Sequence, residues 1–222
     1  MSISKAQALG IVFRSADTYA QELENRNLLF ICVDKHGRTS AFETAFHDYN
    51  YQHLTGLETA QTLSAQLFYQ ACLNRRLSVN DFEFHPNGTS EMKLDVLPLL
   101  VNKHLGPARF IGVYNGKNPL LFTDRVAGSV KGGIGFIRDG GIGPYVPNTL
   151  LGGDMRQYIT DMRRVAITYR KTTVDAEYSE IVYSAKGIDW STFFIAGALY
   201  LASVTRSKIT SFIDQAVPAF YF

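Results

Sequence analysis

The sequence predicts an α+β domain over residues 1–186, followed by a helical extension over residues 187–222 that packs on this domain or on a partner. Three observations lead to this prediction. Apolar residues recur with the helical period of about 3.6 in three segments before residue 105. Beyond residue 109 the spacing changes to the two-residue period of strands. Residues 190–204 then form a run of 15 residues without charge.

Three helices are predicted, over residues 5–23, 56–74 and 91–105. The second is expected to begin behind a capping box, because Thr55 and Glu58 have the S/T-x-x-E spacing in which a threonine oxygen accepts from an early helix N–H. The third contains Pro98, which removes a backbone donor and predicts a kink or a break.

Alternating residues and turn signals predict two β-hairpins. The first joins residues 28–33 to residues 39–46, and the second joins residues 109–114 to residues 120–123 across Asn115-Gly116-Lys117-Asn118. Further strands are expected over residues 133–138, 165–169 and 178–183. Most of the strand signal therefore lies in the second half of the chain.

Composition is typical of a globular protein, with 46% hydrophobic and 19% charged residues. The first residues lack the continuous apolar run of a secretory signal, so a cytoplasmic protein is expected. Cys32 and Cys72 lie in a predicted strand and helix and are interpreted as buried apolar residues. Residues 190–204 fall short of the roughly 18–20 residues of a membrane span, so no stable membrane insertion is expected. The sequence leaves the oligomeric state open.

The distribution of charge is uneven. The balance is −3 over residues 1–100, +7 over residues 101–171 and −2 over residues 172–222. A basic middle segment is a candidate footprint for a phosphate backbone, and Arg125 and Lys131 are its candidate substrate-binding residues. The alternative is a solvated sheet face rich in lysine and arginine.

Motifs for metals and nucleotides are missing from the sequence. The five histidines have no spacing typical of a zinc site, so neither a metal nor another cofactor is predicted. The glycines between residues 128 and 153 fit neither a P-loop nor a dinucleotide fingerprint. They are interpreted as turns and a loop beside the sheet, although a loop carrying Lys131 is able to close over a phosphate.

Two segments, taken in order, resemble a known family. They are Tyr51, His53-Leu-Thr-Gly-Leu57 and Ala65-Gln-Leu-Phe68-Tyr69, and later Gly135-Phe136, Tyr145-Val-Pro-Asn-Thr149-Leu-Leu and Gly153-Asp154-Met-Arg156. Together they resemble the fourth of the phage families named for barnase, EndoU, the colicin nucleases and RelE. These are predicted ribonucleases encoded by phages and other mobile elements, and the resemblance covers roughly residues 25–170.

The resemblance implies helices packed on an antiparallel sheet, and RNA cleavage without metal by attack of the ribose 2′-OH on phosphorus. His53 takes the family's histidine position, and its ordinary pKa suits either proton-transfer role. Tyr145, Thr149 and Arg156 are the other candidate catalytic residues. Thr55 and Asn148 join the residues expected to contact the substrate.

Three alternatives stay open at this point. In the first, His53 has only a structural role, in which its hydrogen bond fixes the start of the following helix. The protein as a whole is able to act as a non-catalytic module that binds nucleic acid or protein, with an antitoxin, an immunity protein or another partner at the apolar C-terminus. A transferase acting on a nucleotide is the third alternative, which only the glycine count favours.

Overall fold

The structure is a computed structural model, and it describes residues 3–102, 105, 108–117, 121–138 and 143–186. The predicted extension over residues 187–222, with its chargeless run, lies outside the described residues.

The described chain forms four α-helices, one 3₁₀ turn and ten strands. Their order is α1 (Lys5–Glu22), β1 (Arg26–Val33), β2 (Thr39–Phe46), α2 (Asn50–Thr55), β3 (Leu57–Thr59), α3 (Ala65–Leu73), β4 (Phe82–Phe84), α4 (Thr89–Leu100), β5 (Phe110–Tyr114), β6 (Arg125–Gly128), β7 (Gly132–Arg138), β8 (Tyr145–Gly152), η2 (Met155–Gln157), β9 (Ile159–Thr172) and β10 (Glu180–Ser184).

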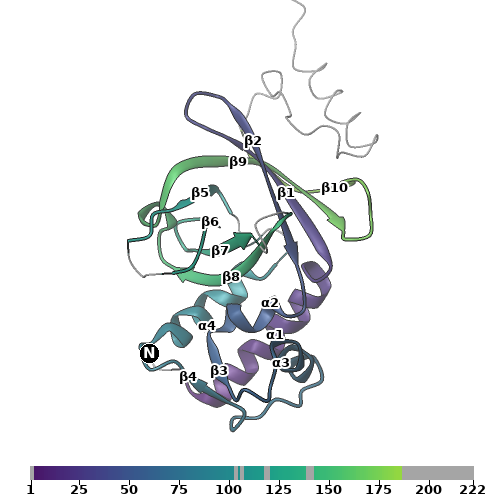
Figure 1. Cartoon of the computed structure of the whole chain (residues 1–222), viewed down its shortest axis with the longest axis vertical. Coiled ribbons are helices and arrows are strands. Elements are labelled where there is room, and N and C mark those ends of the chain that lie inside the picture. The colour runs from purple at the N-terminus through teal and green to yellow at the C-terminus, as the bar shows by residue number, and fades with distance from the viewer. Residues whose placement is uncertain (1–2, 103–104, 106–107, 118–120, 139–142, 187–222) are drawn as a thin grey trace, which may run out of the picture.

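Seven of the strands close into a barrel (Figure 1). The strand order is β1-β2-β8-β7-β6-β5-β9, and β9 pairs with β1 again to complete the ring. All of these pairs are antiparallel except β2–β8, which is parallel and meets at Thr44 and Tyr145. Strand β10 extends the sheet from the edge of β9, and β3–β4 form a separate ribbon. The result is a closed, mixed barrel.

The predicted fold class, helices packed on an antiparallel sheet, is therefore wrong. The sheet closes because β9 is 14 residues long and bulged, so that one part pairs with β5 and another with β1. Such a pairing joins segments more than 130 residues apart, as in Arg26 with Thr172, and no local periodicity encodes it.

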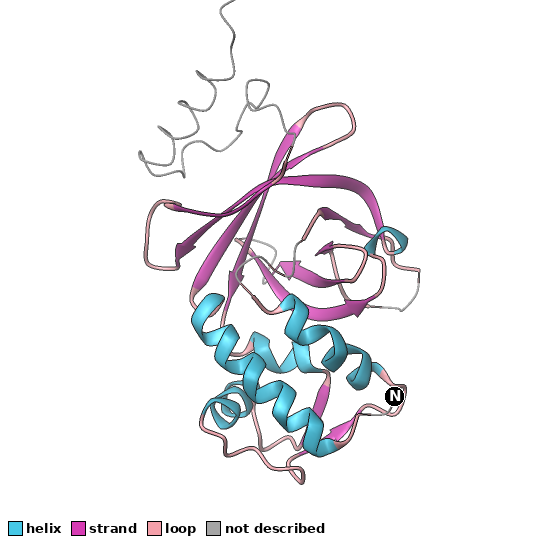
Figure 2. Ribbon diagram, turned by 180° about the vertical axis from the view of Figure 1, so that it is seen from behind, coloured by secondary structure: helices cyan, strands magenta, loops and turns pink. Residues whose placement is uncertain are grey.

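The helices gather on one side of the barrel instead of spreading over a sheet face (Figure 2). One apolar core runs from them into the barrel interior. Tyr51 is central to it: its ring lies 5.3 Å from that of Tyr19 and 5.1 Å from that of Tyr69, and its hydroxyl donates to the carbonyl of Val12. This shared core fixes α2 against the barrel, where it packs on β8.

The first helix is confirmed, and the second is wrong. Helix α1 ends one residue before the predicted boundary and begins behind a capping box made by Ser4 and Gln7. The expected helix over residues 56–74 does not start at Gly56, because this residue has φ 68° and ends the preceding helix α2 instead. Strand β3 follows, and α3 starts only behind the side-chain cap of Ser64.

The remaining expectations have mixed outcomes. The β1–β2 hairpin is confirmed, whereas β6 begins at residue 125 and not at residue 120. Helix α4 ends at Leu100, two residues after Pro98. Strand β8 was not predicted, because its Pro147 and Asn148 are typical of turns. A bulge opposite β7 accommodates Asn148, which has no partner in the register, while Pro147 pairs with Phe136.

The glycines of β6 and β7 permit close packing on the barrel wall. A Cβ atom built at Gly133 would lie 2.6 Å from Sδ of Met155 and 2.8 Å from the carbonyl of Ala127. Glycine at this position lets the η2 turn lie against the strand. The interpretation of these glycines as turns and a loop is thus wrong for those within β7.

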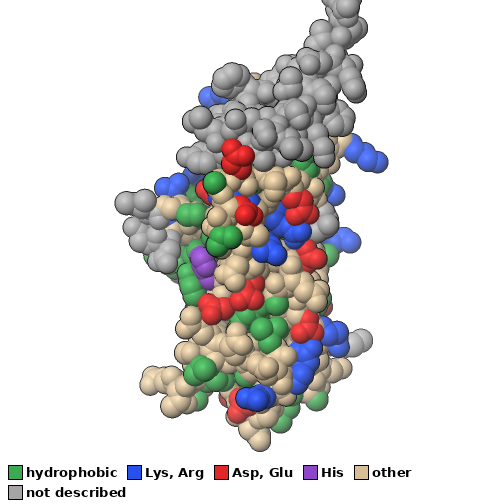
Figure 3. All heavy atoms as spheres, turned by 90° about the vertical axis from the view of Figure 1, so that its right-hand side faces the viewer, with side chains coloured by type: hydrophobic (Ala, Val, Ile, Leu, Met, Phe, Trp, Pro, Cys, Tyr) green, Lys and Arg blue, Asp and Glu red, His purple; other side chains and the backbone are tan. Residues whose placement is uncertain are grey.

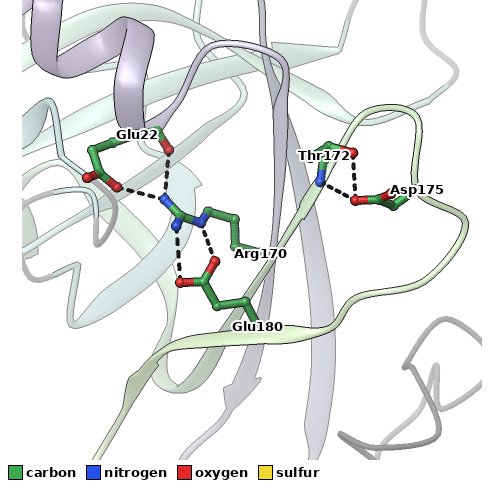
Figure 4. Close-up of polar contacts among 5 residues, drawn as sticks. All are labelled: Glu22, Arg170, Thr172, Asp175 and Glu180. Atoms are coloured by element: carbon green, nitrogen blue, oxygen red, sulfur yellow. Dashed lines mark hydrogen bonds and ion pairs between the residues drawn. The ribbon is translucent and has the colours of Figure 1, made fainter.

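An arginine clamp holds the helical side to the barrel edge (Figure 4). Arg170 of β9 donates to the carbonyl and carboxylate of Glu22, at the end of α1, and its other nitrogens hold both oxygens of Glu180 in β10. In the turn that joins β9 to β10, the backbone N–H and the hydroxyl of Thr172 both donate to the carboxylate of Asp175. The clamp joins α1, β9 and β10.

Replacing Gly133 with alanine is expected to lower the free energy of unfolding by about 1–3 kcal/mol, because the added methyl overpacks the contact with Met155. The matched control is Gly10→Ala in α1, where the nearest atom is the flexible end of Arg14 at 3.3 Å. This control substitution is expected to raise the free energy of unfolding by about 0.5–1 kcal/mol, because alanine favours the helix more than glycine does. Urea unfolding of both variants measures the difference, and equal effects would contradict the packing role.

Candidate active site

His53 lies on the short helix α2, between the barrel and the other helices. It is exposed, and α2 ends two residues later at Thr55. Within the described part of the chain, no hydrogen bond or ion pair engages its imidazole, while its backbone carbonyl accepts from Lys93. A free imidazole at a helix terminus is open to a ligand from solvent.

Lys93 of α4 is the cation next to His53. Only 9% of the lysine is exposed, and its Nζ donates to the His53 carbonyl at 3.0 Å. Its stem passes under Gly56, where a Cβ atom would lie 2.6 Å from Cδ of the lysine. Glycine at this position therefore has two roles, ending α2 and leaving room for the lysine beneath it.

The pKa values of both groups are lowered by their surroundings. Burial lowers the pKa of Lys93 to about 8. Partial desolvation lowers the pKa of His53 below its ordinary value, and repulsion from the Lys93 ammonium lowers it further. At neutral pH the pair is consequently a neutral imidazole beside a mostly protonated amine, which is the combination of a proton acceptor and a cationic donor.

Sequence reasoning missed Lys93. Its position in α4 falls three residues after Ser90 and four before Leu97, both fully buried. A lysine on the apolar stripe of a predicted helix could have indicated this residue. Lysine is almost never fully buried without a partner, so such a position points to a specific contact.

Tyr145 and Arg125 line two neighbouring pockets that share Ala41 and Phe42 of β2. The Tyr145 pocket has a volume of about 210 Å³ and the Arg125 pocket about 150 Å³. Neither pocket has His53 in its lining. The structure thus places Tyr145 and Arg125 in adjoining but separate pockets, and His53 in neither.

The Tyr145 pocket holds both charges and aromatic rings. The ring of Tyr145 lies 4.6 Å from Phe42, and the guanidinium of Arg138 lies 4.8 Å from its centroid. Glu43 faces the same pocket and accepts from the hydroxyl of Tyr178 at 2.6 Å. Burial and this carboxylate raise the pKa of Tyr178.

Thr55 is fully buried and does not face solvent. Its hydroxyl donates to the carbonyl of Gln52 and accepts from the backbone of Leu57. These bonds replace the expected capping box and close the turn at the end of α2. Glu58, the expected partner in that box, lies 3.6 Å from His85 instead.

Asn148 and Thr149 hold β8 and its neighbours. Asn148 donates to the carbonyl of Phe122 and accepts from Thr123, while Thr149 is 5% exposed. The contacts of both residues in the structure are with the loop before β6 and with the barrel wall.

Arg156 and Lys131 lie on separate parts of the surface. Arg156 is exposed on η2 and forms an ion pair with Asp154. Lys131 is exposed in the turn between β6 and β7, whereas Arg125 begins β6 at the other end of that strand. The two expected substrate-binding cations are thus separated by the length of a strand.

Part of the positive charge of the basic middle segment is neutralised by ion pairs. Arg156, Arg163 and Arg170 each form ion pairs with acidic side chains. On the face shown in Figure 3, basic and acidic side chains are interspersed. The net balance of +7 over residues 101–171 therefore overstates the unpaired positive charge on this part of the surface.

Two absences are observed among the described residues. No three histidine, cysteine, aspartate or glutamate side chains gather there in an arrangement able to hold a metal ion. No helix in the same part of the chain is long and apolar enough to cross a membrane.

An exposed neutral imidazole beside a buried amine, in a barrel that also has arginine-lined pockets at β2 away from His53, supplies the kinds of group that act on phosphate esters. Comparison with protein families identifies the class of protein. The chain belongs to the family described as phage-Barnase-EndoU-ColicinE5/D-RelE like nuclease4, whose model matches residues 11–187. The resemblance is thus confirmed over a longer segment than expected, and nucleic acid is the substrate class that the family implies.

No curated protein and no solved structure matches the chain.

The burial of Lys93 is testable through the pH dependence of stability. Between about pH 8, the folded pKa, and about pH 10.5, the ordinary value, the unfolded chain binds more protons than the folded chain. The free energy of unfolding should therefore rise with pH in this window, by at most about 3 kcal/mol from this residue. Lys93→Met should lack this increment. Urea unfolding across the window measures it, and identical pH dependence in both proteins would refute the buried cation.

Proposed function

We propose that the protein is a metal-independent ribonuclease that cleaves RNA by attack of the 2′-OH on the adjacent phosphorus. The observation that supports this most directly is the free imidazole of His53 beside the Lys93 ammonium, in a chain of a nuclease family. The family's description as phage nucleases also supports a role as a toxin or effector of mobile-element origin.

Each group has a defined part in the proposed reaction. Neutral His53 accepts the proton of the 2′-OH as that oxygen bonds to phosphorus. The Lys93 ammonium, which has two N–H donors besides the one bound to the His53 carbonyl, stabilises the added charge on the phosphate oxygens. The bond from phosphorus to the 5′-oxygen then breaks, and a general acid protonates the leaving oxygen.

Tyr145, Thr149 and Arg156 stay candidate catalytic residues through the resemblance alone. Among the described contacts, none joins any of them to His53, so the proposed chemistry rests on His53 and Lys93. A partner for residues 187–222, such as an antitoxin or immunity protein, likewise stays a prediction.

His53→Ala is expected to lower RNA cleavage in EDTA by about 100-fold or more, because it removes the proton acceptor. Thermal melting should change little, since the side chain is exposed. The matched control is His36→Ala, which removes an exposed histidine from the turn between β1 and β2. Purified proteins are incubated with total RNA and fragments are resolved by electrophoresis.

Each outcome has a defined meaning. Full activity of folded His53→Ala would exclude His53 as the proton acceptor. Activity of the wild type that disappears in EDTA would exclude the metal-independent reaction. No cleavage by any variant would favour the non-catalytic binding module.

The pH profile of cleavage should be bell-shaped. Activity rises as pH passes the lowered pKa of His53, which must lose its proton, and falls as pH passes about 8, where Lys93 loses its charge. Lys93→Arg should move the falling limb to higher pH, because arginine stays protonated. An unchanged falling limb in a folded, active Lys93→Arg protein would show that Lys93 does not set it.

A further inference from the structure

The Arg125 pocket is built from five strands of the barrel. Its lining comes from β1, β2, β5, β6 and β9, and it combines an apolar floor with polar side chains. Phe42 and Ile111 belong to the main core, and Cys32 beside them is buried. Burial raises the pKa of the Cys32 thiol to about 12, so it stays neutral.

Arg125 is the free cation of this pocket. It is half-buried, and no described residue forms an ion pair or hydrogen bond with its guanidinium. The second arginine, Arg163, is bound to Asp161 at 3.0 Å, so these two charges largely cancel. The pocket therefore has a net charge of about +1. The guanidinium of Arg125 offers five N–H donors, and Ser40 in the same lining adds a hydroxyl.

A singly charged, oxygen-rich anion matches this arrangement. Arginine binds phosphate oxygens through two parallel N–H bonds, and the apolar floor strengthens the attraction by excluding water. The pocket is small, with a volume of about 150 Å³ against about 210 Å³ for the Tyr145 pocket. This space holds a phosphodiester group with a bridging water, and it is small for a whole nucleotide.

We propose that the Arg125 pocket binds one phosphodiester group of single-stranded RNA, distinct from the group cleaved beside His53. The pocket holds the backbone and reads no base, because its polar side chains are the free Arg125 fork, the Arg163 fork bound to the Asp161 carboxylate, and a hydroxyl. From this pocket the bound RNA continues across β2 toward Arg138. The guanidinium of Arg138 lies over the ring of Tyr145 in the adjoining pocket. The identity of the ligand rests on the proposed ribonuclease function.

Binding of a labelled 2′-O-methyl RNA oligonucleotide tests this site without any need for cleavage, because the attacking hydroxyl is blocked. Fluorescence anisotropy is recorded over a salt titration for the wild type, Arg125→Ala and Arg125→Lys. The control is Arg14→Ala, which removes an equal charge from an exposed position on α1. Thermal melting confirms that each variant is folded.

Arg125→Ala is expected to bind about tenfold more weakly or worse, and to lower the slope of log affinity against log salt by about 0.7. Arg125→Lys keeps the slope but loses part of the affinity, because a single ammonium replaces the fork. Arg14→Ala should match the wild type.

If the Arg125→Ala and Arg14→Ala variants bind the RNA with equal affinity, the proposed site is wrong. It is also wrong if the wild type shows no salt-dependent RNA binding. The two proposals fail separately. Cleavage that does not depend on Arg125 would leave the ribonuclease standing without this site. Arg125-dependent binding without cleavage would leave the site standing without the ribonuclease.

Discussion

The pairing of β1 with β9 is the constraint on which the rest of the structure depends. It runs from Arg26 opposite Thr172 to Val33 opposite Arg164, and it turns a row of strands into a ring. A bulge between Ile31 and Cys32 lets the long β9 strand continue past β1 to β5. Closure leaves β1 without a free edge, and it buries inward-facing side chains that an open sheet would leave to be covered by helices.

Closure also decides which polar groups meet. Because β9 crosses beside β1, Arg163 and Asp161 reach the pocket formed by β2, β5 and β6. At the adjoining pocket, the parallel contact of β2 with β8 brings Tyr145 beside Phe42. The pockets of the barrel are therefore products of strand order rather than of neighbouring residues in the sequence.

The helical side has a different electrostatic character. Its central cation, Lys93, is buried and engaged by a carbonyl, whereas Arg125 in the barrel is half-buried and free. A buried amine with a lowered pKa is suited to respond to charge that develops during a reaction, and a free guanidinium is suited to hold charge that is always present. The two sites consequently fit different tasks on one polyanionic substrate.

The sequence by itself determined helix α1, the β1–β2 hairpin and the family, because periodicity, turn residues and short motifs are local properties. It also singled out His53 through a motif, a prediction that stays open, but not its neighbour Lys93. Only the tertiary structure decided that the barrel closes, that Thr55 is buried, that Arg156 is paired and that Arg125 is free. The physical reason is that burial and pairing depend on contacts between distant segments, such as the 40 residues between His53 and Lys93, and no local pattern specifies these contacts.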